Sequence, residues 1–355
     1  MIRRFEKLYK RIIPLSDMKK GNGLKKWSFL VVVVVLVLVL GFIFFSNEKS
    51  TGGLNEIDFE LSWFHGGFWG YAYVADYNGY FADEGLSVTL HENKGSTITS
   101  SLIGSGQSPI GIVSADVALM AKSKGVPLTV VAIIDKVSHA GLTCHTDVNL
   151  SDPKNLEGKK IGVTRTSNTY QQFLMFAKMN DIDLSKIEEI PISGAGQEFI
   201  AGAVDCHALS PFVTKSIADL KGVETNTLVY YDHGLNMYSH GIVVNDDYLE
   251  ENPEIVQRVV NAILKGFKYE QENPEEALRI MLEENPELNA PYEEKLFYMR
   301  NEFNDKLFGG SDPTDGLQDL ETWQNTEDIM DDLGFLDSDV NLEEFFTNEF
   351  VTRSE

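Results

Sequence analysis

The chain has 355 residues, of which 43% are hydrophobic and 24% are charged, and its formal net charge is −24. This acidic balance excludes nucleic acid as an expected partner, because a phosphate backbone attracts basic surfaces. The sequence has only two cysteines, which excludes a disulfide-framework fold and any metal site built from several cysteines.

The basic residues gather at the amino end. Residues 1–27 carry nine basic and two acidic residues, whereas the rest of the chain carries 21 basic and 52 acidic residues. Residues 28–46 contain an uncharged apolar run from Phe29 to Phe45, near the short end of what crosses a bilayer. Because flanking positive charge stays in the cytoplasm, the sequence predicts a cytoplasmic segment, one transmembrane helix in the cell membrane and an extracytoplasmic remainder.

The hydrophobic segment is expected to remain as an anchor or uncleaved signal. The stretch from Ile43 to Asn47 lacks the small-residue pattern that precedes signal-peptide cleavage. No cysteine directly follows the run, so a lipid-modified amino terminus is not expected. Residues 47–56 form a linker, and the remainder is long enough to bury a full core in two lobes.

From residue 57 onward, strand-like and helix-like segments alternate. The expected strands are 57–61, 87–92, 110–113, 128–134, 141–145, 160–163, 187–192, 204–209 and 228–231. The expected helices are 71–81, 96–104, 115–123, 169–180 and 197–202, and the chain from Tyr248 onward is mostly helical. This alternation predicts an α/β fold in which two βα blocks form two lobes.

Three Asn-Pro-Glu triplets begin at Asn252, Asn273 and Asn285. Asparagine accepts free amide hydrogen bonds at a helix start, and proline suits the first helical position. Glutamate complements the positive end of the helix dipole. The triplets therefore predict three helix starts.

Cysteines and histidines give no sign of a metal site. Cys144 and Cys206 lie in apolar strand-like stretches, which favours buried free thiols, although an oxidising exterior would permit one bridge. Six of the seven histidines are scattered without metal-ligand spacing, at His65, His139, His145, His207, His233 and His240. We therefore expect no bound metal.

A series of short motifs carries a resemblance through its order and spacing. The motifs are Trp63, Gly79-Tyr80-Phe81, Glu84-Gly85-Leu86, residues 102–106, Gly111, residues 158–163, Gly202-Ala203-Val204-Asp205, residues 245–249 and Asn252-Pro253-Glu254. Over about residues 57–280 the chain resembles the nitrate/sulfonate/taurine and thiamine-pyrimidine solute-binding proteins of ABC importers, the SsuA/THI5-like and NMT1-like group.

The resemblance implies a type II periplasmic-binding-protein fold, with a hinge and a ligand cleft between two α/β lobes. Lobe 1 would comprise residues 57–138 plus 237–355, and lobe 2 residues 139–236. The implied function is capture of a small molecule, without a cofactor, and its delivery to an ABC permease with its ATPase. A membrane-tethered sensing module that acts through a partner is the alternative.

Thiamine-pyrimidine synthases resemble the chain over the same length, so an enzyme has to be considered. Those enzymes carry a Schiff-base lysine and a reacting histidine, whose positions here are Val113 and Val117. Valine offers neither an amine nor an imidazole. The sequence therefore predicts a binding protein without catalytic residues.

Two ligand classes remain open, a sulfonate- or nitrate-type anion and a pyrimidine-type heterocycle. Hydroxyl-rich helix starts suit an anion, and an aromatic loop suits a flat ring. The predicted ligand-binding residues combine both kinds of group: Trp63, His65, Phe68, Trp69, Ser96, Thr97, Ser114, Arg165, Ser167, Asn168, Thr169 and Tyr238.

Overall fold

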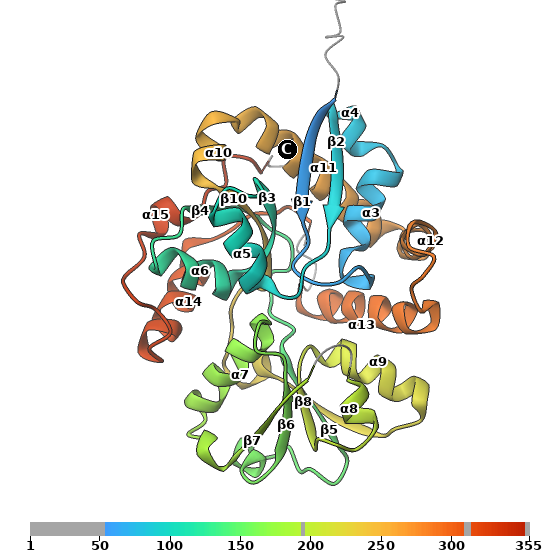
Figure 1. Cartoon of the computed structure of the whole chain (residues 1–355), viewed down its shortest axis with the longest axis vertical. Helices are drawn as coiled ribbons and strands as arrows, with labels where there is room; N and C mark the ends of the chain where they lie inside the picture. Colours follow the sequence, from blue (N-terminus) through green and yellow to red (C-terminus); the bar gives the residue numbers. More distant parts are fainter. Residues whose placement is uncertain (1–53, 193–195, 309–313, 352–355) are drawn as a thin grey trace, which may run out of the picture. The chain divides into compact units, whose positions relative to one another are not determined.

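Two five-stranded sheets organise the protein in the computed structural model, which describes residues 54–192, 196–308 and 314–351 (Figure 1). The predicted cytoplasmic segment and membrane anchor lie outside the described residues. Within those three ranges, no helix combines the length and apolarity needed to span a membrane.

The first sheet has the strand order β2-β1-β3-β10-β4. Its strands are β1 (Asn55–Glu60), β2 (Leu86–His91), β3 (Ile110–Ser114), β4 (Leu128–Ile133) and β10 (His240–Asn245). Strand β1 runs parallel to β2 and β3, whereas β10 enters between β3 and β4 and runs antiparallel to both. A distant part of the chain therefore returns to complete this sheet.

The second sheet has the order β7-β6-β8-β5-β9. Its strands are β5 (Gly141–His145), β6 (Lys160–Val163), β7 (Glu188–Pro191), β8 (Cys206–Ala208) and β9 (Thr225–Val229). Strand β5 runs antiparallel to β8 and β9. The chain crosses between the sheets twice, after β4 and before β10.

Helices pack on both sheets, as the βα pattern predicts (Figure 1). They are α3 (Gly70–Tyr77), α4 (Tyr80–Asp83), α5 (Ser96–Gly104), α6 (Ala115–Ser123), α7 (Asn168–Met179), α8 (Gln197–Ile200), α9 (Pro211–Lys221), α10 (Asp246–Glu251), α11 (Pro253–Glu272), α12 (Pro274–Glu284), α13 (Ala290–Phe308), α14 (Leu320–Asp332) and α15 (Leu342–Phe345). Helices α3 and α11 approach closely at Gly266, where a Cβ atom would lie 2.3 Å from the Tyr71 carbonyl oxygen.

Two local expectations are wrong. The helix expected over 71–81 is divided into α3 and α4, because Gly79 adopts a left-handed conformation with φ of 73°. The strand expected over 228–231 starts earlier and ends at Val229, and a 3-10 turn from Tyr230 to His233 follows it.

The Asn-Pro-Glu triplets also differ from the expectation. Helices α11 and α12 begin at the prolines of the first two triplets, whereas the third triplet begins no helix, because α13 starts only at Ala290. The asparagine side chains do not cap the following helices. Each donates backwards instead to the last turn of the preceding helix, Asn252 to the Tyr248 oxygen at 3.3 Å, Asn273 to the Tyr269 oxygen at 3.2 Å and Asn285 to the Met281 oxygen at 2.9 Å.

Cys144 and Cys206 form a disulfide, so the expectation of free thiols is wrong. Cys144 on β5 lies directly opposite Cys206 on β8, with their Cα atoms 4.0 Å apart. The antiparallel register creates this pair, and nothing in the local sequence of either strand reveals that register.

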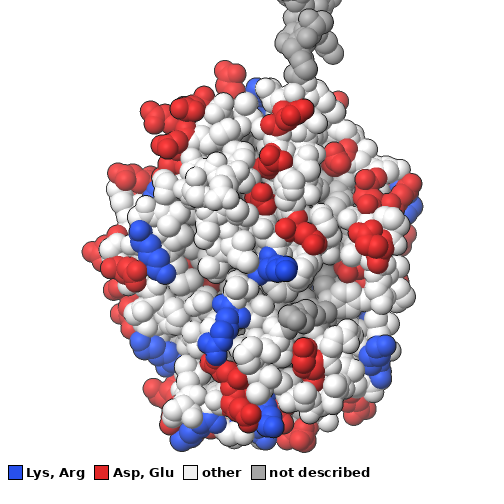
Figure 2. Space-filling model, in the orientation of Figure 1, with Lys and Arg blue, Asp and Glu red and all other residues white. Residues whose placement is uncertain are grey.

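Acidic side chains are spread over the surface. Figure 2 shows Asp and Glu side chains across the face in view, with Lys and Arg at fewer places. This distribution agrees with the acidic balance of the sequence beyond residue 27.

Candidate functional site

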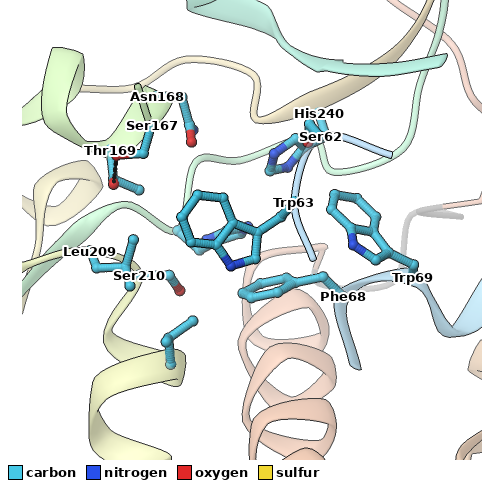
Figure 3. Close-up of a pocket in the computed structure, with 12 residues that line it drawn as sticks. Ser62, Trp63, Phe68, Trp69, Ser167, Asn168, Thr169, Leu209, Ser210 and His240 are labelled. Atoms are coloured by element: carbon cyan, nitrogen blue, oxygen red, sulfur yellow. Dashed lines mark hydrogen bonds between the residues drawn. The ribbon is translucent and has the colours of Figure 1, made fainter. Parts of the chain in front are cut away.

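A pocket lies between the part of the protein that carries the first sheet and the part that carries the second (Figure 3). It is lined by Ser62, Trp63, Phe68, Trp69, His139, Ser167, Asn168, Thr169, Leu209, Ser210, Val213 and His240. Three groups of these residues follow the carboxyl ends of β1, β6 and β8. Ligands of α/β proteins bind at such strand ends, so the topology favours this pocket as the candidate binding site.

The aromatic wall of the pocket contains one ring with an accessible surface and several supporting rings. Trp69 is only 2% exposed, and its indole Nε1 donates to the Phe64 carbonyl oxygen at 3.0 Å. Phe68 stacks on His139 with ring centroids 5.1 Å apart. Trp63 is partly exposed, and Figure 3 shows its ring in the middle of the pocket. Trp63 is therefore the ring best placed to stack on a ligand.

The opposite wall is formed by polar residues at the start of α7 and by Ser210, together with the apolar side chains of Leu209 and Val213. Ser167 caps α7, since its Oγ accepts from the Tyr170 amide at 3.3 Å and donates to the Thr164 oxygen at 2.7 Å. The Ser210 Oγ is buried without a hydrogen-bond partner. A buried hydroxyl left unpaired is costly, so Ser210 offers a polar contact to a ligand.

A buried ionic group contacts His240, one of the residues that line the pocket. Arg300 is fully buried and donates to the Glu270 carboxylate at 2.7 Å and to Asp135 at 3.4 Å. The other oxygen of Asp135 lies 3.3 Å from His240 Nδ1. Burial raises the pKa of Asp135, but Arg300 and His240 outweigh burial and hold that pKa well below its usual range. Burial raises the pKa of Glu270 despite the neighbouring Arg300.

His139 is the least satisfied polar side chain of the pocket. It is 4% exposed, and neither ring nitrogen has a hydrogen-bond partner. Burial lowers the pKa of His139 to about 3, so the imidazole is neutral at pH 7. A neutral imidazole has one nitrogen that donates and one that accepts.

The structure brings together six of the predicted ligand-binding residues at this pocket: Trp63, Phe68, Trp69, Ser167, Asn168 and Thr169. Their binding role stays a prediction. The pocket also contains residues that the sequence reasoning did not assign to it: Ser62, His139, Leu209, Ser210, Val213 and His240. Of these, Leu209 and Ser210 follow β8, so the strand-end rule could have found them.

The serine and threonine residues predicted around α5 do not line the pocket. The Ser96 hydroxyl accepts from the Ser114 amide at 3.1 Å, and the Ser114 hydroxyl donates to Asp116. Thr97 is exposed and borders a separate surface depression. Internal hydrogen bonds therefore occupy the two buried hydroxyls.

The other three predicted residues are also bonded elsewhere. His65 contacts the Tyr73 hydroxyl at 2.6 Å in a neighbouring depression. Arg165 donates to the Glu189 carboxylate at 2.5 Å. The Tyr238 hydroxyl donates to Asp319 at 2.5 Å. None of these three side chains is among the residues that line the pocket.

Comparison with known sequences confirms the resemblance. Residues 69–277 match the family described as NMT1/THI5 like. The formylaminopyrimidine-binding protein of Halalkalibacterium halodurans is 24% identical over 333 residues, covering 90% of this chain and 98% of that protein. The riboflavin-binding protein RibY of Chloroflexus aurantiacus is 26% identical, covering 79% and 81%. The 4-amino-5-hydroxymethyl-2-methylpyrimidine phosphate synthase of Candida albicans is 23% identical, covering 63% and 69%.

Solved structures confirm the fold. The alkanesulfonate-binding protein SsuA from Xanthomonas axonopodis pv. citri bound to MOPS superimposes with a TM-score of 0.64 and 14% identity, covering 84% of this chain and 99% of that one. A Candida albicans protein described as having the generic periplasmic binding protein fold gives a TM-score of 0.60 and 16% identity, covering 85% and 98%. The protein thus has an α/β periplasmic-binding-protein fold with two five-stranded sheets, and it belongs to the NMT1/THI5-like family.

Proposed function

We propose that the protein is a membrane-tethered, extracytoplasmic solute-binding protein that captures a flat, uncharged heterocycle and delivers it to an ABC permease with its ATPase. The observation that carries the proposal is the composition of the pocket. Aromatic rings line one wall, hydroxyls line the other, and none of the described residues that line it is a lysine or arginine. Pockets of this kind bind small, mostly apolar solutes with a few fixed polar contacts.

The heterocycle is favoured by the groups left available in the pocket. The partly exposed Trp63 ring suits stacking on a flat solute. The unpartnered atoms of His139 and Ser210 suit hydrogen bonds to the edge of that solute. The nearby Arg300 is already paired with Glu270 and Asp135, so its charge is not free for an anion. Relatives named for binding formylaminopyrimidine and riboflavin support this solute class.

A small oxyanion is the second candidate, because the amino end of α7 lines the pocket. Backbone amides and the helix dipole attract negative charge at such an end. The predicted cation beside it, Arg165, is bound to Glu189 and does not line the pocket. The helix end would then have to balance the charge of the anion without a basic side chain, which makes this candidate the weaker one.

Capture would use closure of two lobes, residues 57–138 plus 237–355 and residues 139–236. The two crossovers beside the pocket are the natural hinge, because among the described residues only these two segments connect a strand of one sheet to a strand of the other. Hinge closure around a ligand in the cleft gives a permease a closed form to recognise. The binding proteins among the relatives match a larger share of this chain than the synthase does, and Val113 and Val117 are buried apolar residues, which supports binding rather than catalysis.

The proposed location is the outer face of the cell membrane, with residues 28–46 as the anchor. The basic residues before the apolar run and the acidic balance after it support this orientation. The disulfide between Cys144 and Cys206 also fits an oxidising compartment. A protease added to intact cells should digest the binding domain, whereas full protection until lysis would place the domain inside.

Ligand binding can be tested with the purified full-length protein in detergent. Melting would be followed against two sets of compounds, sulfonates with nitrate, and pyrimidines with flavins and related heterocycles. A ligand at about a hundred times its Kd adds about 2.7 kcal/mol to the stability of the folded state. Stabilisation by heterocycles alone supports the proposal, and stabilisation by oxyanions alone assigns the site to the amino end of α7. A folded protein stabilised by neither set contradicts the proposed solute classes.

A further inference from the structure

Three metal-ligating side chains converge where the chain crosses between the two sheets. Asp135 follows β4, His139 precedes β5 and His240 opens β10. All three are buried, and a carboxylate oxygen of Asp135 and one ring nitrogen of each histidine lie within 4.8 Å of one another. We propose that Asp135, His139 and His240 form a binding site for a divalent transition-metal ion, for which zinc is the best match.

The unsatisfied ring nitrogens of His139 are a second observation, besides the clustering of the three side chains, that points to a bound ion. The side chain is 96% buried, since its exposed fraction is 4%, yet both ring nitrogens lack a hydrogen-bond partner. Leaving a buried polar group unpaired costs about 1–3 kcal/mol. Phe68 and His240 hold the ring from its two sides, with centroid distances of 5.1 and 5.6 Å. Coordination of an ion would satisfy a nitrogen that has no hydrogen-bond partner among the described residues.

The set of donor atoms selects the class of ion. Two imidazoles and one carboxylate suit zinc and its neighbours in the first transition series, whereas calcium and magnesium prefer oxygen ligands. Zinc bonds of about 2.0–2.2 Å require the three side chains to move slightly inward from their present separations. Arg300 holds the Asp135 oxygen that does not face His240, and such outer hydrogen bonds orient a ligating carboxylate.

Arg300 brings a positive charge close to the proposed site. Whether this charge repels a metal ion depends on the carboxylates with which Arg300 forms ion pairs. One guanidinium nitrogen, Nη1, donates to Glu270 at 2.7 Å, and the other, Nη2, donates to Asp135. The charge of Asp135 balances that of Arg300, and an ionised Glu270 would add one negative charge. An ion would therefore not meet a net positive environment.

The site opens into the pocket, because His139 and His240 both line it. Three protein ligands leave at least one coordination position for water or for an atom of a bound molecule. The inference goes beyond the proposed function and does not rest on it, because binding of an ion can be measured without any solute.

The test uses the full-length protein without a polyhistidine tag, treated with EDTA and then freed of EDTA by dialysis. Calorimetric titration with zinc chloride should show one ion per chain. The variants His139→Phe and His240→Phe should each bind zinc at least about tenfold more weakly, because the loss of a direct ligand costs no less than the loss of an outer-shell partner. Phenylalanine keeps the ring contacts, and melting of the metal-free variants checks that they are folded.

His91→Ala is the matched control. His91 is an exposed histidine paired with Asp58 at 2.7 Å, so it offers the same donor types at the surface. Its variant should bind zinc as the wild type does. A second measurement uses the wild type alone. After addition of cobalt(II), its visible absorption spectrum should show the intense d–d bands of a four-coordinate site.

Two results would overturn the proposal. One is a wild-type protein that takes up neither zinc nor cobalt, and the other is binding that survives in both His139→Phe and His240→Phe. Repeating the heterocycle panel in EDTA separates this failure from that of the proposed function, because stabilisation by a heterocycle there leaves solute capture standing while the metal site fails.

Discussion

Gly95, before α5, touches the backbone of Thr166, before α7. A Cβ atom on Gly95 would lie 2.2 Å from the Thr166 carbonyl oxygen, and the Thr166 hydroxyl donates to the Lys94 oxygen at 2.7 Å. Gly95 lies in the part of the protein that carries the first sheet, and Thr166 lies in the part that carries the second. Residues 167–169, which follow Thr166, line the pocket. The two sides of the pocket therefore meet at a point that admits no side chain.

Gly95→Ala is expected to hold the two sides apart. The added methyl group would meet the Thr166 backbone, which cannot move aside as a flexible side chain can. We expect the affinity for a solute that stabilises the wild type to fall at least about tenfold, which corresponds to about 1.4 kcal/mol. Small-angle X-ray scattering with that solute present should give a larger radius of gyration than for the wild type.

Gly106→Ala is the control for this variant. Gly106 also has a positive φ, 71° against 126° at Gly95, but a Cβ atom there would have no neighbour within 4 Å. Gly106→Ala should lose about 1–2 kcal/mol of stability, the cost of a left-handed conformation. Gly95→Ala should lose about 1–3 kcal/mol, because φ of 126° and ψ of 150° lie in a region that is essentially restricted to glycine. Equal effects of the two variants on solute affinity would contradict the role of the contact in closure.

Trp63→Ala should weaken a stacked heterocycle by about 1–3 kcal/mol, the usual worth of stacking between a base and an aromatic side chain. Trp63→Phe keeps a flat ring and should retain most of the affinity. Calorimetric titration of both variants measures the effect. A loss of similar size for sulfonates would show that the ring does more than stack on flat solutes.

Trp69 cannot serve for the same test. Its ring is 2% exposed and packs edge-on against Tyr71 and His240. Trp69→Ala should destabilise the fold by about 3–5 kcal/mol through the cavity it leaves. Urea unfolding would measure that cost, and a change in binding would then follow from lost structure.

The sequence predicted most strands and helices in their order and part of the pocket, for a common physical reason, but it did not predict α9 or β10. Hydrophobic periodicity shows where strands end, and Trp63 and Ser167 follow such ends directly, so both reach the pocket. Ser96 opens a helix in the same way, but its hydroxyl accepts from the Ser114 amide. No local pattern distinguishes a hydroxyl that faces the pocket from one that is used internally.

Contacts between distant segments were not predictable. His139 and His240 meet because two separate crossovers pass the same point, with ring centroids 5.6 Å apart. Cys144 and Cys206 meet because β5 and β8 are antiparallel neighbours in one register. Both pairs depend on the strand order, which a single sequence does not state.

Removal of the disulfide should lower the stability of the part of the protein that carries the second sheet. The bridge closes a loop with a sequence separation of 62 residues, and bridges over such loops contribute about 2–4 kcal/mol. Urea unfolding of the wild type with and without a reductant measures the loss. The double variant Cys144→Ala with Cys206→Ala should be equally destabilised and insensitive to the reductant, and a wild type unaffected by reduction would contradict the prediction.

Glu293 should make stability depend on pH near neutrality. Its carboxylate accepts from the Gly67 amide at 2.7 Å, beside the loop that carries Phe68. Burial raises the pKa of Glu293 to about 7 from 4.5, despite this hydrogen bond. Between these two values the folded protein holds a proton that the unfolded chain has released, so the free energy of unfolding falls as the pH rises from about 4.5 to about 7 and levels off above it.

Glu293→Gln removes this contribution while keeping the shape of the side chain. Urea unfolding at about pH 5 and about pH 8 should show a smaller fall in stability for Glu293→Gln than for the wild type. Glu294→Gln changes an exposed neighbour on α13 and should retain the wild-type fall. If Glu293→Gln loses as much stability as the wild type between the two pH values, another group holds the proton and Glu293 does not cause the pH dependence.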